Sequence, residues 1–596
     1  MCGFIGSISF NKINNELIKN ANTYSICRGP DNQKNFKGSE EINFDLWFNR
    51  LSIVDLNENA NQPMVSQSYN SILLFNGEIY NSDNLRNNLL KDKYEFKTSH
   101  SDTETLLAGL NLYGIKFVNE LEGQFAFVYW NRDQKQIFLA RDRVGQKPLY
   151  YNFDKHSINF ASNLKSLAKV CGNTFLSNQA LKEYLNFGAV FSPNTIFNNY
   201  FKVEPGKYLS INYQNNIMEM SKKTYWQVED YFDNQKFDYH EFNEIFSQAV
   251  SKRLISDVPV ANFLSGGIDS TSIIKNLSDN GYEINTFSAT YDNEFIDESM
   301  YINEVVEKYK TEHISANIDK EITNDLIFEA LNSLDEPYGD PSVVPSYNIS
   351  KLISEKYKVA ISGDGGDELL GGYPRVKNHL LPRSSLKNFY SKFYNIFPYF
   401  LGTGSSFLSF SNNEDEAYLS NLEDKKVVKA FTKSDTYSKE LKKLVKVDSK
   451  YKSYLINDYY LYLYDQMMFK VDRTSMANSI EVRSPFVDHK LIEYVLSHTY
   501  EYLETNISKF PLIKYLQTDF DEHFLHRQKQ GFVFDYEKWI YTNADLVKNT
   551  IQSSQISAVI DVSKLNLLLK VKTRINSLRL WRLFVLCDYF NSYKYL

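Results

Sequence analysis

Cysteine is scarce in this sequence, and its four copies stand far apart at Cys2, Cys27, Cys171 and Cys587. This spacing excludes the disulfide framework of a small secreted domain, and it excludes a zinc site built from Cys-x-x-Cys pairs. Thiols kept free in this way are typical of a reducing compartment. We therefore expect a cytoplasmic protein in which a thiol remains available for chemistry.

Long apolar runs and a surplus of positive charge are missing as well. No stretch reaches the length of a membrane span. The first residues, Met-Cys-Gly-Phe-Ile-Gly, lack the basic start and the long apolar segment of a secretory signal. The formal net charge of −7 argues against nucleic acid as the main partner. We expect neither a membrane partner nor a nucleic-acid partner.

The chain does have length and the composition of a globular protein. Its 596 residues, of which 43% are hydrophobic and 23% charged, are too many for one ordinary core, so we expect at least two domains. Short strand patterns separated by turns fill the first part, at residues 2–9, 44–51, 71–75, 124–130, 136–142 and 158–161. Helical patterns cover residues 82–90 and 102–113, with Asp102 as the predicted cap of the second helix. Many strands with few helices predict a layered α+β domain.

A polar stretch rich in Asn and Gln follows, and beyond it the pattern changes. Strand patterns at residues 258–264, 284–290 and 359–362 alternate with helical patterns at 269–280 and 346–356, which predicts a parallel sheet covered by helices. The tail at residues 575–590 places apolar residues at helical spacing, as expected for core packing. We predict a first domain at residues 2–211, a linker at 212–236 and a second domain at 237–596.

Cys2 directly follows the initiator methionine. A side chain this small usually permits removal of that methionine, which leaves a residue with both a thiol and a free α-amine. The amine titrates at about 8 and the thiol at about 8.5, so the amine can act as the nucleophile's own base. On its own, a cysteine at this position is usually just a cysteine.

Four strings after Cys2 change its interpretation: Arg28-Gly29-Pro30-Asp31, then Asn49-Arg50-Leu51-Ser52-Ile53-Val54-Asp55, then Phe75-Asn76-Gly77-Glu78, then Ser101-Asp102-Thr103-Glu104. Each string alone reads as an ordinary turn. Together, after Met-Cys-Gly, they resemble the class II glutamine amidotransferases, a family of N-terminal-nucleophile enzymes.

The resemblance implies a catalytic role for three residues. Cys2 is expected to attack the side-chain amide of glutamine and form a γ-glutamyl thioester. The Asn76 side chain and the Gly77 backbone N–H are expected to form the oxyanion hole. Cys27 stands where many relatives have histidine before Arg-Gly-Pro-Asp, which leaves the tuning of the Cys2 site open.

The same resemblance implies a set of glutamine-binding residues. Arg50 is expected to hold the α-carboxylate, and Glu78 and Asp102 to accept from the α-ammonium. The full expected set is Arg50, Val54, Asn76, Gly77, Glu78 and Asp102.

A glycine-containing loop, Leu264-Ser265-Gly266-Gly267-Ile268-Asp269-Ser270, lies between a buried strand pattern and a helix. Glycines allow backbone N–H groups to converge on an anion, and the helix N-terminus adds favourable partial charge. A Walker loop needs a lysine that is absent here. A Gly-Gly turn before a helix is common by itself, but this one resembles the pyrophosphate loop of the N-type ATP pyrophosphatases.

A second loop, Ser362-Gly363-Asp364-Gly365-Gly366-Asp367-Glu368, gathers three carboxylates among glycines. Carboxylates placed this close together favour a compensating cation, and Mg²⁺ carrying pyrophosphate is the natural one. An exposed acidic turn is the plain alternative, although it needs fewer glycines. Further strings follow at residues 470–477, 481–488 and 527–532.

These strings together resemble the synthetase domain of the glutamine-hydrolysing asparagine synthetases, and the resemblance covers nearly the whole chain. It implies an α+β N-terminal-nucleophile sandwich followed by an α/β parallel-sheet ATP pyrophosphatase domain. The implied ATP and pyrophosphate contacts are Leu264, Ser265, Gly266, Gly267, Asp269, Ser270, Ala289, Ser362 and Gly363, and the implied Mg²⁺ ligands are Asp269 and Asp367. Asp364 and Lys529 are the implied catalytic residues, with Asp364 standing where many asparagine synthetases have glutamate.

The implied reaction joins two half-sites. A carboxylate is activated by ATP as an acyl-adenylate and then takes ammonia released at Cys2, which yields an amide, AMP and pyrophosphate. Aspartate is the favoured acceptor, and a uronic acid of a surface polysaccharide precursor is an alternative. A catalytically silent binding relative is the alternative from another class, and a homodimer is a further expectation.

Overall fold

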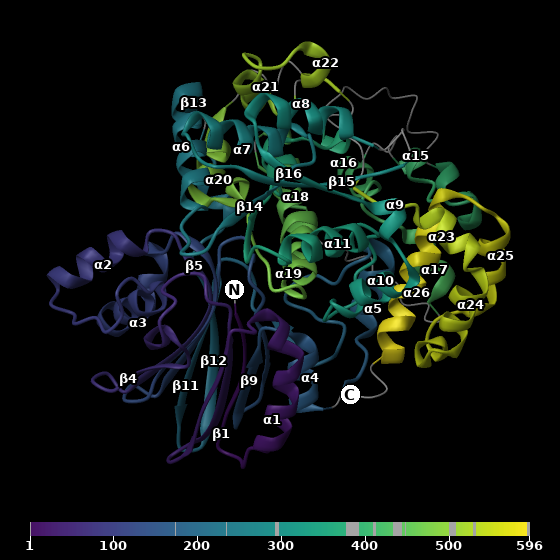
Figure 1. Cartoon of the computed structure of the whole chain (residues 1–596). Coiled ribbons are helices and arrows are strands. Elements are labelled where there is room, and N and C mark those ends of the chain that lie inside the picture. The colour runs from purple at the N-terminus through teal and green to yellow at the C-terminus, as the bar shows by residue number, and fades with distance from the viewer. Residues whose placement is uncertain are drawn as a thin grey trace.

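The computed structural model describes residues 2–172, 174–233, 235–292, 297–376, 392–408, 413–432, 444–447, 449–499, 508–527 and 532–592. Figure 1 shows a first domain in purple and blue beside a larger second domain that runs from teal to yellow. The expected order of an α+β domain followed by an α/β domain is confirmed.

The first domain contains two six-stranded sheets, both antiparallel. One sheet has the order β10-β8-β9-β1-β3-β2 and the other β12-β11-β7-β6-β5-β4. The strands of the first sheet are β1 (Gly3–Ser9), β2 (Asn32–Ser39), β3 (Asn43–Arg50), β8 (Tyr150–Phe153), β9 (Ser157–Ala161) and β10 (Phe201–Lys202). Those of the second are β4 (Met64–Ser66), β5 (Ser71–Ile79), β6 (Gly123–Asn131), β7 (Gln136–Arg141), β11 (Lys207–Gln214) and β12 (Ile217–Thr224).

Helices cover the outer faces of both sheets, which makes four layers (Figure 1). The helices α1 (Asn15–Asn22) and α4 (Leu164–Cys171) pack on the first sheet, and α2 (Ser82–Lys91) and α3 (Asp102–Tyr113) pack on the second. All seven residues of β1 are buried, because a helix layer covers one face of the strand and the second sheet covers the other. Cys2 joins the core between the sheets.

Two details of the sequence interpretation are wrong. The predicted linker at residues 212–236 includes residues 212–224, which instead lie in the hairpin of β11 and β12 at the edge of the second sheet, where solvent exposure favours polar side chains. Asp102 does not cap α3, because Ser101 holds the N-cap position and the Asp102 carboxylate accepts from the Ile79 N–H at 3.1 Å instead.

The second domain is built on a five-stranded sheet of order β16-β15-β14-β17-β18, and every neighbouring pair is parallel. Its strands are β14 (Val260–Phe263), β15 (Asn285–Thr290), β16 (Glu312–Asn317), β17 (Val359–Ile361) and β18 (Glu481–Arg483). The helices α6 (Tyr239–Lys252), α7 (Ile268–Asp279) and α8 (Ser299–Tyr309) cover one face, and α11 (Val343–Ser354) covers the other. The strand order changes direction between β14 and β17, which is the place where α/β sheets bind ligands.

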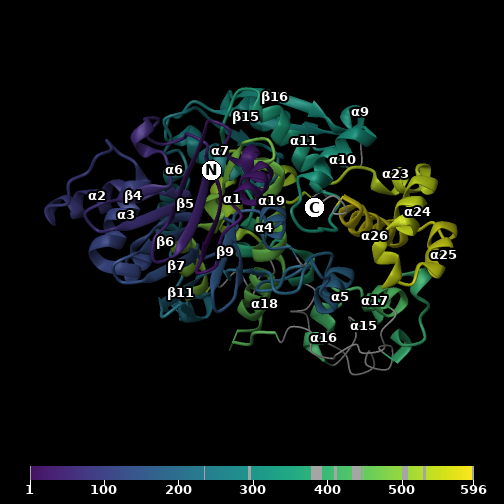
Figure 2. The ribbon, with the colours of Figure 1, turned by 90° about the horizontal axis from the view of Figure 1, so that it is seen from below.

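The tail forms α26 (Arg574–Ser592), whose Leu580, Trp581 and Phe584 are fully buried, as the helical spacing predicts. Figure 2 shows α26 beside α10 and α23–α25, away from the first domain's α2 and α3. The remaining helices are α5 (Asn178–Phe187), α9 (Ile318–Glu321), α10 (Asn324–Asn332), α12 (Gly366–Leu370), α15 (Ser405–Leu408), α16 (Glu414–Leu419), α17 (Lys425–Phe431), α18 (Lys450–Asp458), α19 (Met468–Met476), α20 (His489–Ser497), α21 (Phe510–Leu516), α22 (Glu522–Leu525), α23 (Tyr536–Thr542), α24 (Ala544–Ser553) and α25 (Leu565–Lys570). A short pair of strands, β13 (Gln235–Lys236) and β19 (His498–Thr499), completes the described strands. Among the described residues, no helix has both the length and the apolar character needed to cross a membrane.

Candidate active sites

Cys2 lies immediately before β1, where the two sheets of the first domain face each other. Its backbone N–H donates to Asn76 Oδ1 at 2.9 Å, and its Sγ lies 4.0 Å from the carbonyl oxygen of Leu51. Burial raises the pKa of the Cys2 thiol above its ordinary value. A nearby base is therefore needed to generate the thiolate.

Asn76, in β5, is oriented by that contact with Cys2. Because a backbone N–H can only donate, the amide atom that faces Cys2 N must be the oxygen. The nitrogen Nδ2 is buried and has no hydrogen-bond partner among the residues that the structure describes. The next residue, Gly77, has no room for a side chain, since a Cβ there would lie 2.1 Å from the carbonyl oxygen of Gln124. A free amide donor beside the thiol has the chemistry of an oxyanion hole.

Arg50, at the end of β3, organises the loop that follows it. Its guanidinium donates to the carbonyl oxygens of Asn57 at 2.9 Å and Val54 at 3.3 Å, to Asn61 Oδ1 at 2.8 Å and to the Asp55 carbonyl oxygen. The structure therefore brings Arg50 and Val54 together, with Arg50 buried inside the loop of residues 51–61, which we call the glutamine loop.

Glu78 and Asp102 are buried carboxylates close to each other, and the guanidinium of Arg483 pairs with Glu78 and with Glu481. Glu78 Oε2 accepts from Arg483 Nη2 at 3.1 Å, while Glu78 Oε1 is buried and has no partner among the described residues. Burial, followed by the charge of Asp102, raises the pKa of Glu78 well above its ordinary value, and burial raises the pKa of Asp102 to about 6. A pair of this kind is suited to a bound ammonium, which would favour the charged carboxylates.

The first glycine loop of the second domain joins β14 to α7. Gly266 has a φ of 67°, a left-handed conformation that favours glycine. Ser265 Oγ accepts from the Gly267 N–H at 3.2 Å and lies 3.2 Å from Ser270 Oγ, so the loop folds around these two hydroxyls. Leu264 is buried in the core, and its carbonyl oxygen accepts from Ser288 Oγ. The loop leads into the N-terminus of α7, a helix of twelve residues, and this position gives the loop the character of an anion site.

The second glycine loop joins β17 to α12 and packs directly against the first. Gly363 approaches so closely that a Cβ there would lie 3.0 Å from the Asp269 Cβ. Asp364 is held by Ser362 Oγ, which donates to its Oδ2 at 2.8 Å, and by Ser484 Oγ, which donates to its carbonyl oxygen at 2.5 Å. Ala289, near the end of the neighbouring strand β15, is half-buried. The loops expected to bind ATP are thus adjacent at the switch point of the sheet.

Lys509 is a site residue that the sequence did not reveal. Its Nζ lies 2.5 Å from Asp269 Oδ2 and 2.5 Å from Asp367 Oδ1, although it is 240 residues beyond Asp269. Lys509 precedes α21 and belongs to none of the glycine-rich strings, so no local signal marks it. Lys529, the lysine that the resemblance implied, lies outside the described residues.

Asp269 and Asp367 present the oxygen donors that Mg²⁺ prefers, and two carboxylates are the usual protein share of a magnesium–phosphate site. The space around them depends on glycine. A Cβ at Gly366 would lie 2.6 Å from Asp269 Oδ1, and one at Gly372 would lie 1.9 Å from Asp367 Oδ1. The two carboxylates already share the Lys509 cation, so the donor set and the room around it fit a cation bound with phosphate.

Comparison with known proteins identifies both halves of the chain. The family model described as Asparagine synthase matches residues 241–590, and the model described as Glutamine amidotransferase domain matches residues 1–226. The chain belongs to the asparagine synthase family. It is a glutamine-hydrolysing, amide-forming ligase of that family.

Three curated relatives of this synthase-family chain are asparagine synthetases by name. The glutamine-hydrolysing asparagine synthetase 1 of Bacillus subtilis is 32% identical, over 94% of this chain and 91% of the relative. A putative glutamine-hydrolysing asparagine synthetase 2 of Methanocaldococcus jannaschii is 34% identical, over 63% of this chain and 76% of the relative. Asparagine synthetase 3 of Bacillus subtilis is 28% identical, over 89% of this chain and 87% of the relative.

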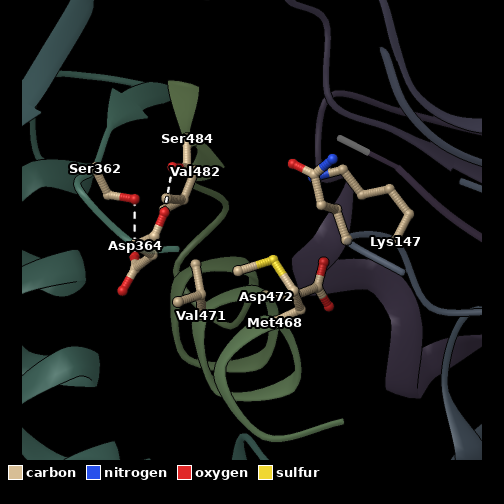
Figure 3. Close-up of a pocket in the computed structure, with 9 residues that line it drawn as sticks. Lys147, Ser362, Asp364, Met468, Val471, Asp472, Val482 and Ser484 are labelled. Carbon is tan, nitrogen blue, oxygen red and sulfur yellow. Dashed lines mark hydrogen bonds between the residues drawn. The ribbon is translucent and has the colours of Figure 1, made fainter. Parts of the chain in front are cut away.

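A small cavity in this member of the asparagine synthase family lies where the two domains meet. Residues of both domains line it: Gln146, Lys147, Ser362, Asp364, Met468, Val471, Asp472, Val482 and Ser484. Figure 3 shows Asp364, Ser362 and Ser484 on one side of the cavity and Lys147 on the other. The volume of this cavity, about 20 Å³ for the centre of a water molecule, is enough for one water-sized molecule. Burial lowers the pKa of Lys147 to about 8.

Arg28 joins the nucleophile to this cavity. Its Nε donates to the Cys2 carbonyl oxygen at 3.2 Å, while Nη1 and Nη2 donate to the two carboxylate oxygens of Asp472 at 2.8 Å and 2.9 Å. Both side chains are buried, and the positive charge of Arg28 contributes to holding the pKa of Asp472 below its ordinary value despite its burial. One side chain of the glutaminase motif therefore contacts both the residue expected to react and the helix that lines the cavity.

Proposed function

We propose that the protein makes asparagine from aspartate, with glutamine as the nitrogen donor and ATP as the energy source. The observation that carries the proposal is that one chain holds the Cys2–Asn76 arrangement and the two ATP-loop candidates, with a cavity at the domain interface that Ser362 and Asp364 of the second loop line. A glutamine-hydrolysing ligase needs both half-sites, and a silent binding relative would not need to keep the buried free donor of Asn76.

In the proposed glutaminase step, Cys2 reacts as the first residue of the processed chain. Its α-amine takes the thiol proton, and Sγ attacks the amide carbon of glutamine. Asn76 Oδ1, which accepts from Cys2 N, holds the amine in place. Asn76 Nδ2 and the Gly77 N–H stabilise the oxyanion as the carbon becomes tetrahedral. The α-ammonium passes this proton to the amide nitrogen, ammonia leaves, and water then hydrolyses the γ-glutamyl thioester to glutamate.

We propose that Arg50, Glu78 and Asp102 bind the α-carboxylate and the α-ammonium of glutamine. The free Oε1 of Glu78 and the buried position of Asp102 support the ammonium contact. Val54 lies beside the Arg50 guanidinium, on the loop that encloses it.

In the proposed synthetase step, Ser265, Gly266, Gly267 and Ser270 receive the β- and γ-phosphates at the N-terminus of α7. Asp269 and Asp367 would hold Mg²⁺, which would neutralise phosphate charge when bound. The β-carboxylate of aspartate attacks the α-phosphorus, pyrophosphate leaves, and aspartyl-adenylate forms. Lys509 and Lys529 supply positive charge as the α-phosphate becomes more negative.

Ammonia completes the reaction from the domain interface. It attacks the aspartyl carbonyl carbon, AMP leaves, and Asp364 at the cavity wall accepts the proton that the new amide loses. We also propose a cytoplasmic location, which agrees with the free thiols of all four cysteines, and a homodimer that sedimentation would test.

The acceptor is tested by pyrophosphate release from ATP in the presence of glutamine and a panel of carboxylates. We expect aspartate to give the largest stimulation, with AMP and asparagine formed in equal amounts. Stimulation by a uronate but not by aspartate would replace the acceptor and keep the two half-sites. Absence of stimulation by any carboxylate would favour a silent relative.

A further inference from the structure

The glutamine loop, residues 51–61 of the first domain, is held from outside by the second domain. The Asp55 N–H donates to Asp257 Oδ2 at 2.8 Å, and the Asp257 N–H donates in return to the Ile53 carbonyl oxygen at 2.9 Å. These two hydrogen bonds join Asp257 to the glutamine loop on either side of Val54. His100 Nε2 lies 2.7 Å from the same Asp257 oxygen.

Asp55 needs this support because of its backbone conformation. Its φ of 52° is left-handed, a conformation that is unfavourable for most residues and that Asp adopts when hydrogen bonds hold it. Its side chain is fully buried and accepts from the Asn57 N–H at 3.2 Å, so the conformation is held from both ends of the residue. The carbonyl oxygen of Asp55 in turn accepts from Arg50.

The apolar side chains of the loop also rest on the second domain. Leu51 and Ile53 pack with Val359 and Met476, and Val54 packs against the same cluster with Val258 and Val260. Val359 and Val260 begin β17 and β14, the two strands whose carboxyl ends carry the glycine loops. The glutamine loop therefore contacts one end of the strands that hold the second site at their other end.

We propose that Asp257 is a positioning residue for the glutamine site, acting across the domain interface through the glutamine loop. This inference rests on the proposed function, in which Arg50 holds the glutamine carboxylate. Without Asp257, the Asp55 N–H loses its acceptor, which is one of the contacts that hold Asp55 in the left-handed conformation. The Val54 and Asp55 carbonyl oxygens then move, and the guanidinium of Arg50 turns with them. Glutamine binding is weakened, while the synthetase site keeps all its own contacts.

The test compares two kinetic readouts in full-length Asp257→Ala and Asp257→Asn variants. Glutamate release measured against glutamine concentration gives KM and kcat for the first site, and pyrophosphate release with ammonium chloride reports the second site and the fold. For Asp257→Ala we expect KM for glutamine to rise about tenfold with kcat changed less, as for the loss of one charge-assisted hydrogen bond. Asp257→Asn keeps an oxygen acceptor for the Asp55 N–H, so its KM should rise less.

Glu122→Gln is the matched control, because Glu122 forms ion pairs across the same domain interface, with Lys252 at 2.7 Å and Lys490 at 2.5 Å. Within the described residues, neither ion pair involves the glutamine loop. We expect its KM for glutamine to stay at the wild-type value. An unchanged KM for glutamine in Asp257→Ala would overturn the inference, and so would a rise of KM in Glu122→Gln as large as that in Asp257→Ala. A loss of ammonia-supported synthesis in both Asp257 variants, as large as their loss of glutamine-dependent activity, would also overturn it. If the wild-type protein released no glutamate from glutamine, the proposed function would fail instead.

Discussion

The side-chain amide of Asn76 has two roles, one for its oxygen and one for its nitrogen. Its oxygen faces the Cys2 N–H at 2.9 Å, and its nitrogen is left as a buried donor beside the thiol. The sequence could predict that Asn76 and Cys2 act together, because the strings around them resemble a known family. It could not predict the orientation of the amide, which depends on a contact between residues 74 positions apart.

The proposed contact of Asp102 with the glutamine ammonium predicts a pH dependence that arises from a single residue. Burial raises its pKa to about 6, above the ordinary value of about 3.9. The carboxyl is therefore charged above about pH 6 and neutral below it, and a neutral carboxyl attracts the α-ammonium of glutamine less. We expect KM for glutamine in glutamate release to rise as the pH falls below about 6, by at most about tenfold per pH unit.

The control for this profile is ammonia-supported pyrophosphate release, which does not use Asp102. Asp102→Asn should have a high KM for glutamine at every pH and should lose the rise below pH 6. A wild-type KM that stays constant between pH 5 and pH 8 would contradict the assignment of Asp102 to the ammonium.

At the scale of elements, strand and helix patterns predict most of what positions the two sites. β1, β5, β6, β14, β15 and β17 and the helices α2, α3, α7 and α11 all lie where the patterns place them, within a few residues. Among the strands that the patterns do not predict, three have a clear physical reason. β2 and β16 are largely exposed edge strands with no apolar alternation. β18 is a buried Glu-Val-Arg strand, whose Arg483 Nε pairs with Glu481 Oε1 at 2.6 Å, and a charged pair of this kind does not read as a strand.

Asp367, at the start of α12 after the loop from β17, allows a test of the second site. Asp367→Asn removes one of the two carboxylates that share Lys509, and it removes one oxygen donor proposed for Mg²⁺. We expect pyrophosphate release to fall at least about a hundredfold, as when a group that stabilises transition-state charge is lost. Glutamate release should continue at a basal rate. Unchanged pyrophosphate release would exclude Asp367 from the ATP site.

At the scale of the whole molecule, the two domains are joined by buried charge that no sequence pattern shows. Arg28 and Asp472 are 444 residues apart, and they form a bidentate pair that also includes the Cys2 carbonyl oxygen. Arg473, the next residue, pairs with Asp335 at 2.9 Å and extends the buried network. The strings that contain Arg28 and Asp472 were visible in the sequence, but their pairing was not.

The Arg28–Asp472 pair predicts a strong coupling in stability. Asp472→Ala leaves Arg28 buried without its partner, and we expect the free energy of unfolding to fall by about 3–5 kcal/mol. Urea denaturation of the two single variants and of Arg28→Ala/Asp472→Ala should show that the double variant loses less than the sum of the single losses. Removing the more exposed Glu122–Lys490 pair by Lys490→Ala should cost about 1 kcal/mol or less. Additive losses for Arg28 and Asp472 would contradict the coupling.

The most direct test of two half-sites in one molecule is asparagine formation by Cys2→Ala with either glutamine or ammonium chloride as the nitrogen source. We predict that the variant makes no asparagine from glutamine and makes it from ammonia, with ATP and aspartate, at the wild-type rate. Asparagine formation from glutamine by the variant, or loss of synthesis from both nitrogen sources, would contradict the account.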